Sequence, residues 1–149
     1  MNLKNANNVP LKILFLCTGN SARSQMAEGW ARALKSDFIE AYSAGIEAHG
    51  LNPLAVEVMR EVGVDISQQK SKTVTEFLGM DFNFVITLCG HANETCPVFP
   101  GNARVIHVGF EDPAAAKGSK EEQLAVFRKV RDEIRAFVEQ LPGFLISAP

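Results

Sequence analysis

One short stretch of the sequence combines the residue types of a nucleophile and of an oxyanion-binding loop. It holds a cysteine and an arginine separated by five small or polar residues, in the order Cys17-Thr18-Gly19-Asn20-Ser21-Ala22-Arg23-Ser24. Such a loop can curl so that successive backbone N–H groups point at one tetrahedral oxyanion, which the guanidinium of Arg23 can also bind. The same positive groups favour the thiolate form of Cys17. We therefore predict that Cys17 attacks an oxyanion bound by Thr18 to Ser24.

The elements on either side of the loop predict where it lies in the fold. The apolar run from Lys12 to Leu16 predicts a buried strand, and the helical spacing after the loop predicts a helix with Ser24 as N-cap and Trp30 in the core. Further strands are expected at residues 38–44, 82–88 and 104–108, and further helices from Asn52 to Gly63, from Thr73 to Leu78 and from Ser119 to Leu141. Strands that alternate with helices predict an α/β fold with a parallel sheet and helices on both faces.

Ligands of such sheets bind beyond the carboxyl ends of the strands. Cys17, Cys89 and Asp112 each follow a predicted strand, so we expect them at one edge of the sheet. A carboxyl at position 112 can protonate a leaving oxygen. From its position alone, Asp112 is more simply a turn-forming aspartate before proline. Glu28 can brace the loop, or it can be a solvated helix residue.

The other two cysteines suit redox chemistry better than a metal site. Cys89 and Cys96 are seven residues apart and no histidine lies at ligand spacing, so no metal is expected. If Cys17 attacks an oxyanion whose central atom can accept two electrons, Cys89 can take over the covalent link, and Cys96 can then carry the disulfide outward. On the residues alone, unrelated packing roles for Cys89 and Cys96 are an equal alternative.

Composition limits the remaining possibilities. The 149 residues suffice for one domain with a continuous core, and a net charge of -2 gives no electrostatic footprint for nucleic acid or a membrane surface. No apolar run reaches the ~18 residues of a membrane span, and the start lacks the apolar core of a secretory signal. We expect a cytoplasmic monomer, with residues 1–10 as a flexible extension, 11–142 as a single catalytic domain and 143–149 as a flexible tail.

Three motifs in this order resemble those of a known family. The loop at Cys17, the segments Thr87-Leu88-Cys89 and Cys96-Pro97, and the segment Gly109-Phe110-Glu111-Asp112-Pro113 are similar to the thioredoxin-coupled arsenate reductases. These enzymes have the low-molecular-weight protein tyrosine phosphatase fold. The resemblance extends from about Lys12 to Leu141, nearly the whole chain.

The resemblance implies a function and a role for each motif. It implies reduction of arsenate, for which phosphate or sulfate would be mimics, with Cys17 as nucleophile, Arg23 and the loop amides as oxyanion binders and Asp112 as general acid. It implies Cys89 and Cys96 as a disulfide relay, thioredoxin as the reductant and no cofactor. It also implies a three-layer α/β fold, in which a four-stranded parallel sheet of order 2-1-3-4 is flanked by helices.

One position departs from the resemblance. Some family members bind potassium beside the loop, through residues that match Asn20, Glu28 and Ser43 and an acidic residue that aligns with Lys72. A lysine cannot ligate a cation, but its ammonium can take the place of the ion. The departure predicts that activity does not depend on potassium.

Two other functions stay open. A phosphatase of the same fold would form a phosphoenzyme at Cys17, with Arg23 and Asp112 in the same roles. The phosphatases that the chain resembles usually carry aromatic residues after the Asp-Pro pair, whereas this chain has Ala114-Ala115-Ala116. A non-catalytic anion sensor would use the loop and leave Cys89 and Cys96 idle.

Overall fold

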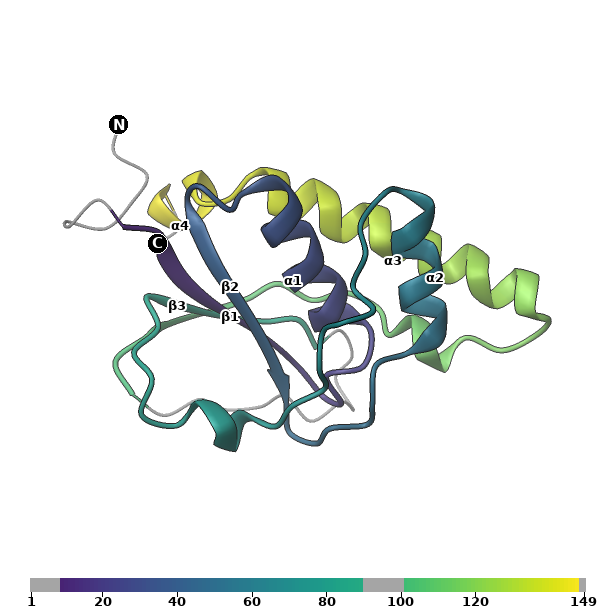
Figure 1. The fold of residues 1–149 in the computed structure, drawn as a ribbon, viewed down its shortest axis with the longest axis horizontal. Helices are drawn as coiled ribbons and strands as arrows, with labels where there is room; N and C mark the ends of the chain where they lie inside the picture. Colours follow the sequence, from purple (N-terminus) through teal and green to yellow (C-terminus); the bar gives the residue numbers. More distant parts are fainter. Residues whose placement is uncertain (1–8, 90–100, 148–149) are drawn as a thin grey trace.

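Four parallel strands form the sheet at the centre of the protein. The computed structural model describes residues 9–89 and 101–147. The strands are β1 (Leu11–Cys17), β2 (Ile39–Gly45), β3 (Phe84–Thr87) and β4 (Arg104–His107), and they lie in the order β2-β1-β3-β4 (Figure 1). The predicted parallel sheet of order 2-1-3-4 is confirmed.

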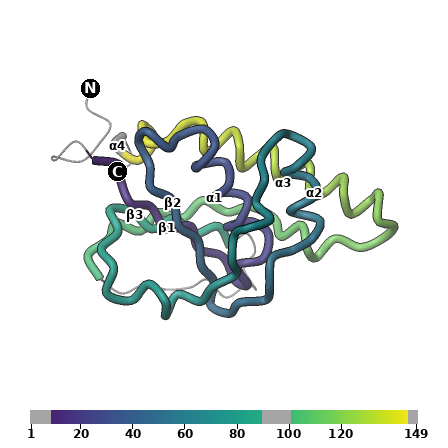
Figure 2. Tube along the Cα trace, viewed as in Figure 1, coloured from purple at the N-terminus to yellow at the C-terminus, as the bar shows by residue number. Residues whose placement is uncertain are grey.

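The α-helices share one apolar core with one face of this sheet. They are α1 (Arg23–Leu34), α2 (Pro53–Glu61), α3 (Lys120–Glu139) and α4 (Gly143–Ser147), and two 3₁₀ helices are η1 (Val74–Phe77) and η2 (Pro113–Ala115). Figure 2 shows α3 passing both α1 and α2, with which it is in contact. The short helix predicted after Thr73 is the 3₁₀ helix η1.

Strand β1 is buried on both faces because its side chains alternate between two apolar cores. Ile13 and Phe15 belong to the core under the α-helices, whereas Leu14 and Leu16 belong to a second, smaller core. Trp30 is 2% exposed in the first core. The predictions of a central buried strand and of a core tryptophan are both confirmed.

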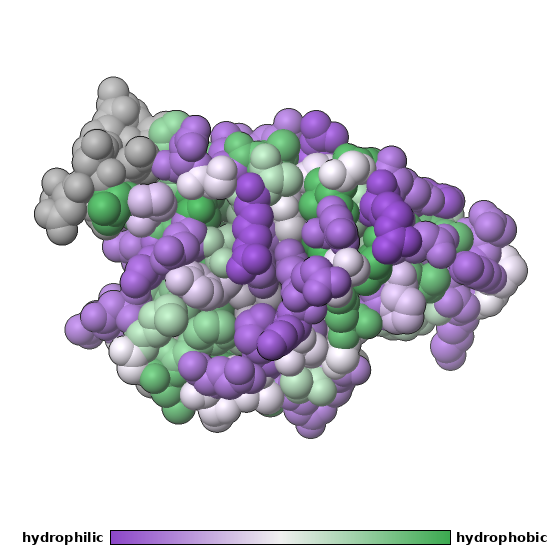
Figure 3. All heavy atoms as spheres, in the orientation of Figure 1, coloured by the Kyte–Doolittle hydropathy of each residue, from purple (hydrophilic) through white to green (hydrophobic). Residues whose placement is uncertain are grey.

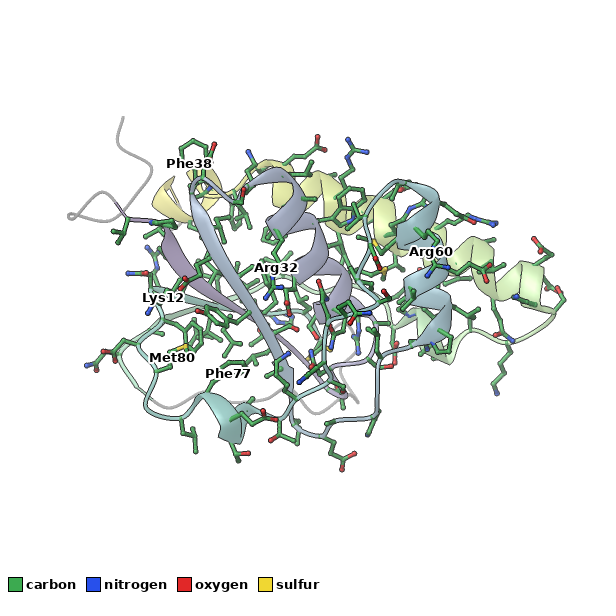
Figure 4. All side chains as sticks on the ribbon, viewed as in Figure 1. Lys12, Arg32, Phe38, Arg60, Phe77 and Met80 are labelled. Carbon is green, nitrogen blue, oxygen red and sulfur yellow. The ribbon has the colours of Figure 1, made fainter. Side chains whose placement is uncertain are left out.

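In the described part of the chain, the segment around η1 covers the second face of the sheet. Phe77, Phe82 and Tyr42 pack edge to face there, with ring centroids 5.4 to 5.8 Å apart. Figure 4 places Phe77 and Met80 on this side of the sheet. Apolar residues also reach the surface here, where Leu78 is 52% exposed, while polar residues cover much of the surface over the helices (Figure 3).

Side-chain caps fix the starts of α2 and α3 as predicted. The Asn52 side chain accepts a hydrogen bond from the backbone N–H of Leu54 at 2.8 Å, and Pro53 takes the first helical position. Ser119 and Glu122 form a reciprocal capping box at the start of α3. These two helix starts follow from local sequence alone.

Helix α1 starts differently from the prediction. Its N-cap is Ala22, which has no side-chain hydrogen bond to offer, and Ser24 lies within the first turn. The prediction of Ser24 as N-cap is therefore wrong. The reason is tertiary, because the Ser24 hydroxyl contacts the Cys17 sulfur instead.

The chain after Leu141 is packed against the body of the protein. Residues 143–147 form α4, Leu145 is completely buried, and the rings of Phe144 and Phe137 pack edge to face. The expected flexible tail at 143–149 is therefore wrong for residues 143–147, whose apolar side chains complete the main core. Residues 1–8 of the expected extension lie outside the described residues. Within the described ranges, no helix is long and apolar enough to cross a bilayer.

Candidate active site

The loop between β1 and α1 is held from outside through its carbonyl groups. Three backbone hydrogen bonds from the segment after β2 reach it: Glu47 N–H to Thr18 O at 3.1 Å, His49 N–H to Gly19 O at 2.9 Å and Asn52 N–H to Ser21 O at 3.0 Å. The C=O and N–H groups of a trans peptide point in opposite directions. These contacts therefore turn the N–H groups of the same peptide units to the other side of the loop, where a tetrahedral anion can bind.

Close backbone contact fixes the residue type at the end of β2. A Cβ on Gly45 would lie 2.6 Å from the backbone nitrogen of Asn20 and 2.8 Å from the carbonyl oxygen of Thr18. Asn20 itself has a φ of 47°, in the left-handed region that asparagine tolerates better than most residues. The loop thus depends on Gly45 for space and on Asn20 for its turn.

Cys17 ends β1 beneath this loop and is 2% exposed. Its Sγ lies 2.8 Å from Oγ of Ser24. Asn20 decides how this contact works, because its Oδ1 accepts the backbone N–H of Lys72 at 2.7 Å and its Nδ2 group must therefore donate. Nδ2 donates to Oγ of Ser24 at 2.8 Å and to Oγ of Ser43 at 3.0 Å. Ser24 accepts this bond and keeps its own proton for the Cys17 thiolate.

The same polar chain continues to a buried carboxylate. Ser43 donates to Oε1 of Glu28 at 2.5 Å, and Glu28 is 2% exposed. Oε2 of Glu28 lies 2.7 Å from Nη2 of Arg32. Of the two predicted roles for Glu28, the structure shows the brace and not the solvated helix residue. Burial lowers the pKa of the Lys72 ammonium, while the nearby Glu28 carboxylate opposes this shift.

Arg23 connects the loop to the ends of the neighbouring strands. This buried side chain donates from Nη1 to the carbonyl of Phe110 at 3.2 Å and to that of Leu88 at 3.5 Å. Its Nη2 lies 3.7 Å from Oδ2 of Asp112, whose side chain is 35% exposed. Asp112 also caps η2 by accepting the N–H of Ala114 at 3.0 Å. Asp112 therefore has both proposed parts, a turn former and a carboxyl at the anion loop.

Cys89 leaves the sheet at the same edge as Cys17. Leu16 on β1 pairs with Thr87 on β3, and the N–H of Leu88 donates to the carbonyl of Leu16 at 2.8 Å. Cys89 follows Leu88 directly and is buried, at 3% exposed, and both cysteines are free thiols. The predicted convergence of Cys17, Cys89 and Asp112 at one sheet edge is confirmed. Cys96 lies outside the described residues.

Further supports of the loop lack a local signature in the sequence. Nε2 of Gln25 donates to the backbone and side-chain oxygens of Asn20 at 3.0 Å, and Gln69 donates to Gln25. Oγ of Ser71 donates to Gly19 O at 3.3 Å. Gln69 and Ser71 lie more than 40 positions from their partners, so only the tertiary contacts reveal them. Within residues 9–89 and 101–147, no three His, Cys, Asp or Glu side chains form a group that could hold a metal.

Comparison with known proteins places this geometry in a family. Residues 12–145 match the family described as low molecular weight phosphotyrosine protein phosphatase. The chain belongs to this family. Within the phosphatase family it is similar to the arsenate reductases of Halalkalibacterium halodurans and Bacillus subtilis, at 57% and 55% identity over 122 residues, which are 82% of this chain and 88% of each relative.

A solved structure agrees with these relatives. It is described as an arsenate reductase in the phosphate binding state and has a TM-score of 0.71 and 36% identity, covering 88% of this chain and 95% of that chain. The resemblance to arsenate reductases and the phosphatase-like fold predicted from the sequence are therefore confirmed, and the chain is a member of an enzyme family.

Proposed function

We propose that this protein is an arsenate reductase that uses Cys17, Cys89 and Cys96 in sequence and thioredoxin as its electron donor. The observation that carries the proposal is the placement of two free, buried thiols at one sheet edge, with Cys17 beneath an anion loop and Cys89 after the adjacent strand. A phosphatase needs the first thiol and has no use for the second. Relatives named arsenate reductase support the choice.

The first step joins arsenate to Cys17. The loop N–H groups and the Arg23 guanidinium bind the oxyanion, and the thiolate attacks the arsenic. A sulfur–arsenic bond forms and an arsenic–oxygen bond breaks, and Asp112 is placed to protonate the oxygen, which leaves as water. The Asp112 carboxyl suits this role because it lies 3.7 Å from Arg23, which holds the anion.

The next steps move electrons from thiols to arsenic. The Cys89 thiolate attacks Sγ of Cys17, a disulfide forms, and the electron pair of the breaking sulfur–arsenic bond reduces arsenic(V) to arsenic(III), which leaves as arsenite. The Cys96 thiolate then attacks Sγ of Cys89 and releases the Cys17 thiolate. The two thiols of thioredoxin reduce the Cys89–Cys96 disulfide, which returns the enzyme to its starting state.

The decisive measurement is NADPH consumption in the presence of arsenate, thioredoxin and thioredoxin reductase. We expect sustained consumption with the native protein and its loss with Cys96→Ser, which can still release one arsenite per molecule. Cys89→Ser is expected to release no arsenite. Either variant turning over like the native protein would refute the relay.

Aryl phosphate hydrolysis distinguishes the phosphatase alternative. Arsenate and phosphate share shape and charge, so we expect weak hydrolysis that needs Cys17 and that survives in Cys89→Ser. Ala114 and Ala115 are exposed and offer no aromatic wall for a tyrosine ring. Robust hydrolysis without arsenate-dependent NADPH consumption would establish the phosphatase and overturn the reductase.

The proposal also fixes surroundings for the enzyme. A relay that ends on thioredoxin needs a compartment where thiols are kept reduced, which is the cytoplasm. We further propose that the enzyme acts as a monomer, because Cys17, Arg23, Cys89 and Asp112 all come from one chain. Size-exclusion chromatography with light scattering tests this directly.

A further inference from the structure

Arg32 forms the solvent end of the polar chain that starts at Cys17. It projects from the last turn of α1 toward β2 (Figure 4), where Nη2 lies 2.7 Å from Oε2 of Glu28 and 3.4 Å from the carbonyl of Ala41. The Arg32 side chain is 57% exposed, whereas that of Glu28 is 2% exposed. The arginine therefore brings its charge from the surface onto a carboxylate that water hardly reaches.

We infer that Arg32 is a positioning residue for Cys17: by neutralising Glu28 at one end of the chain, it allows the thiolate to form at the other end. The inference rests on the proposed function, in which Cys17 must be a thiolate to attack arsenate. Arg32 does not touch the anion loop or the sulfur, and it acts through Glu28, Ser43, Asn20 and Ser24.

Two like charges in one buried network disfavour each other. Glu28 and the Cys17 thiolate are joined through three polar side chains by contacts of 2.5 to 3.0 Å, so both charges lie in one poorly solvated region. With Arg32 paired to Glu28, ionising Cys17 adds a charge beside a neutral pair. Without Arg32, it adds a second negative charge to an uncompensated one.

A protonated Glu28 would not rescue the arrangement. A carboxylate can only accept hydrogen bonds, and this makes Ser43 the donor in their 2.5 Å contact. A carboxylic acid could donate in its place, and the direction of the bond between Ser43 and Glu28 would no longer be fixed. Arg32 therefore supports both the charge balance and the order of the chain.

Other charged groups surround the pair without replacing this contact. They are Lys72 with its neighbours Lys70 and Glu76, the strand residues Glu40 and Tyr42, and Asp65 after α2. Lys72 is the other cation near Glu28, but burial lowers its pKa and its Nζ already donates to the carbonyl of Lys70 at 2.6 Å. Glu40 accepts a hydrogen bond from Tyr42 at 2.8 Å.

The test follows the reactivity of Cys17 against pH. The rate at which iodoacetamide alkylates Cys17 is measured by mass spectrometry of its peptide, in the full chain without arsenate. We expect Arg32→Met to shift the rising limb of this profile to higher pH by up to about one unit, which slows alkylation roughly three- to tenfold at pH 7. Arg32→Lys should restore most of the native profile, because it keeps the charge.

Arg60→Met is the matched control. Arg60 also occupies the last turn of its helix, α2, and it is exposed and points away from the loop (Figure 4). This variant removes one positive charge from an equivalent helix position and should leave the profile of Cys17 unchanged. An equal shift in both variants would reduce the effect to overall charge and overturn the inference, as would a native profile in Arg32→Met.

A double-mutant cycle checks that the effect passes through Glu28. In a Glu28→Gln background, Arg32→Met should produce little further shift, whereas full additivity would contradict the inference. The alkylation measurement needs no arsenate, so the two proposals can fail separately. A shifted profile in a protein that does not reduce arsenate would refute the proposed function and leave the role of Arg32 intact.

Discussion

At the scale of single residues, Ser24 shows how one hydroxyl can serve two very different structures. Its place at the start of a helical pattern suits an N-cap, but its Oγ lies 2.8 Å from the Cys17 sulfur and accepts a bond from Asn20. A hydroxyl that receives one hydrogen bond is well placed to give its own proton to a thiolate. Ser24 therefore supports the nucleophile and does not cap the helix.

Removing this hydroxyl is expected to weaken the nucleophile. A hydrogen bond to a charged group contributes about 1.5–3 kcal/mol, so Ser24→Ala should lower kcat/KM for arsenate roughly 10- to 100-fold. Steady-state NADPH consumption measures the loss. Ser36→Ala, at an exposed serine just after α1, should retain native kinetics. Native kinetics in Ser24→Ala would show that the contact with Cys17 has no catalytic value.

Lys72 carries the prediction about potassium. Its ammonium is near Glu28, whose charge opposes the lowering of the Lys72 pKa by burial, so a fixed positive charge already serves this carboxylate. We expect kcat/KM for arsenate to stay unchanged when sodium is replaced by potassium at constant ionic strength. Choline chloride provides a reference without a small cation. Strong activation by potassium would contradict the prediction.

At the scale of elements, the end of β2 must pass very close to the anion loop. Gly45→Ala would place a methyl group 2.6 to 2.8 Å from three backbone atoms of the loop and of the residues after β2, which cannot rotate away as a side chain can. Overpacking of this kind costs about 1–3 kcal/mol of the free energy of unfolding. We expect a lower Tm and weakened protection of Cys17 from alkylation by phosphate.

Gly143→Ala is the appropriate control for Gly45→Ala. Gly143 starts α4, and a Cβ there would meet no atom within 4 Å. This variant should keep the native Tm and the native protection by phosphate. If Gly45→Ala behaved in the same way, the close approach of β2 to the loop would not be a constraint on the site.

The contact between α2 and α3 predicts a pH dependence of stability. Glu61 accepts from Arg128 at 2.8 Å and from Arg131 at 3.0 Å, and its hydrogen bond with Arg128 is the largest cause that lowers its pKa below the usual 4.5. A carboxyl with a lowered folded-state pKa stabilises the fold above its unfolded pKa, and this stabilisation is lost as the pH falls through the folded value.

Glu61→Gln should therefore lower the Tm at pH 7 by about 2 °C, a small value because the carboxylate is partly exposed. The difference from the native protein should shrink below pH 4.5 and vanish in stronger acid. Thermal unfolding followed by circular dichroism measures both. Glu139→Gln, in a 3.9 Å pair, should show little difference at either pH. A constant difference across pH would contradict a charge effect.

At the scale of the whole molecule, the C-terminal helix closes the main core. Leu145 is completely buried there, so Leu145→Ala should cost about 2–5 kcal/mol and lower the Tm by roughly 5–15 °C. Leu78→Ala removes the same side chain from a site that is 52% exposed and should shift the Tm far less. Equal shifts would mean that α4 does not contribute to the core.

The sequence by itself determined the elements and the main catalytic residues. The caps at Asn52 and Ser119, the buried strand before Cys17 and the order of three motifs are local patterns, and each depends on neighbours a few residues away. Because parallel strands end at one edge of a sheet, the same patterns also predicted that Cys17, Cys89 and Asp112 would converge.

Only the tertiary structure decided how the loop is supported. Its partners, among them Ser43, Gln69, Ser71 and Lys72, lie 23 to 52 positions from the groups that they bind. Such hydrogen bonds depend on strand register and on loops that leave no periodic pattern in the sequence. The same reason explains Ser24 and α4: a hydroxyl and a short apolar segment have no fixed role until the core and the loop around them are complete.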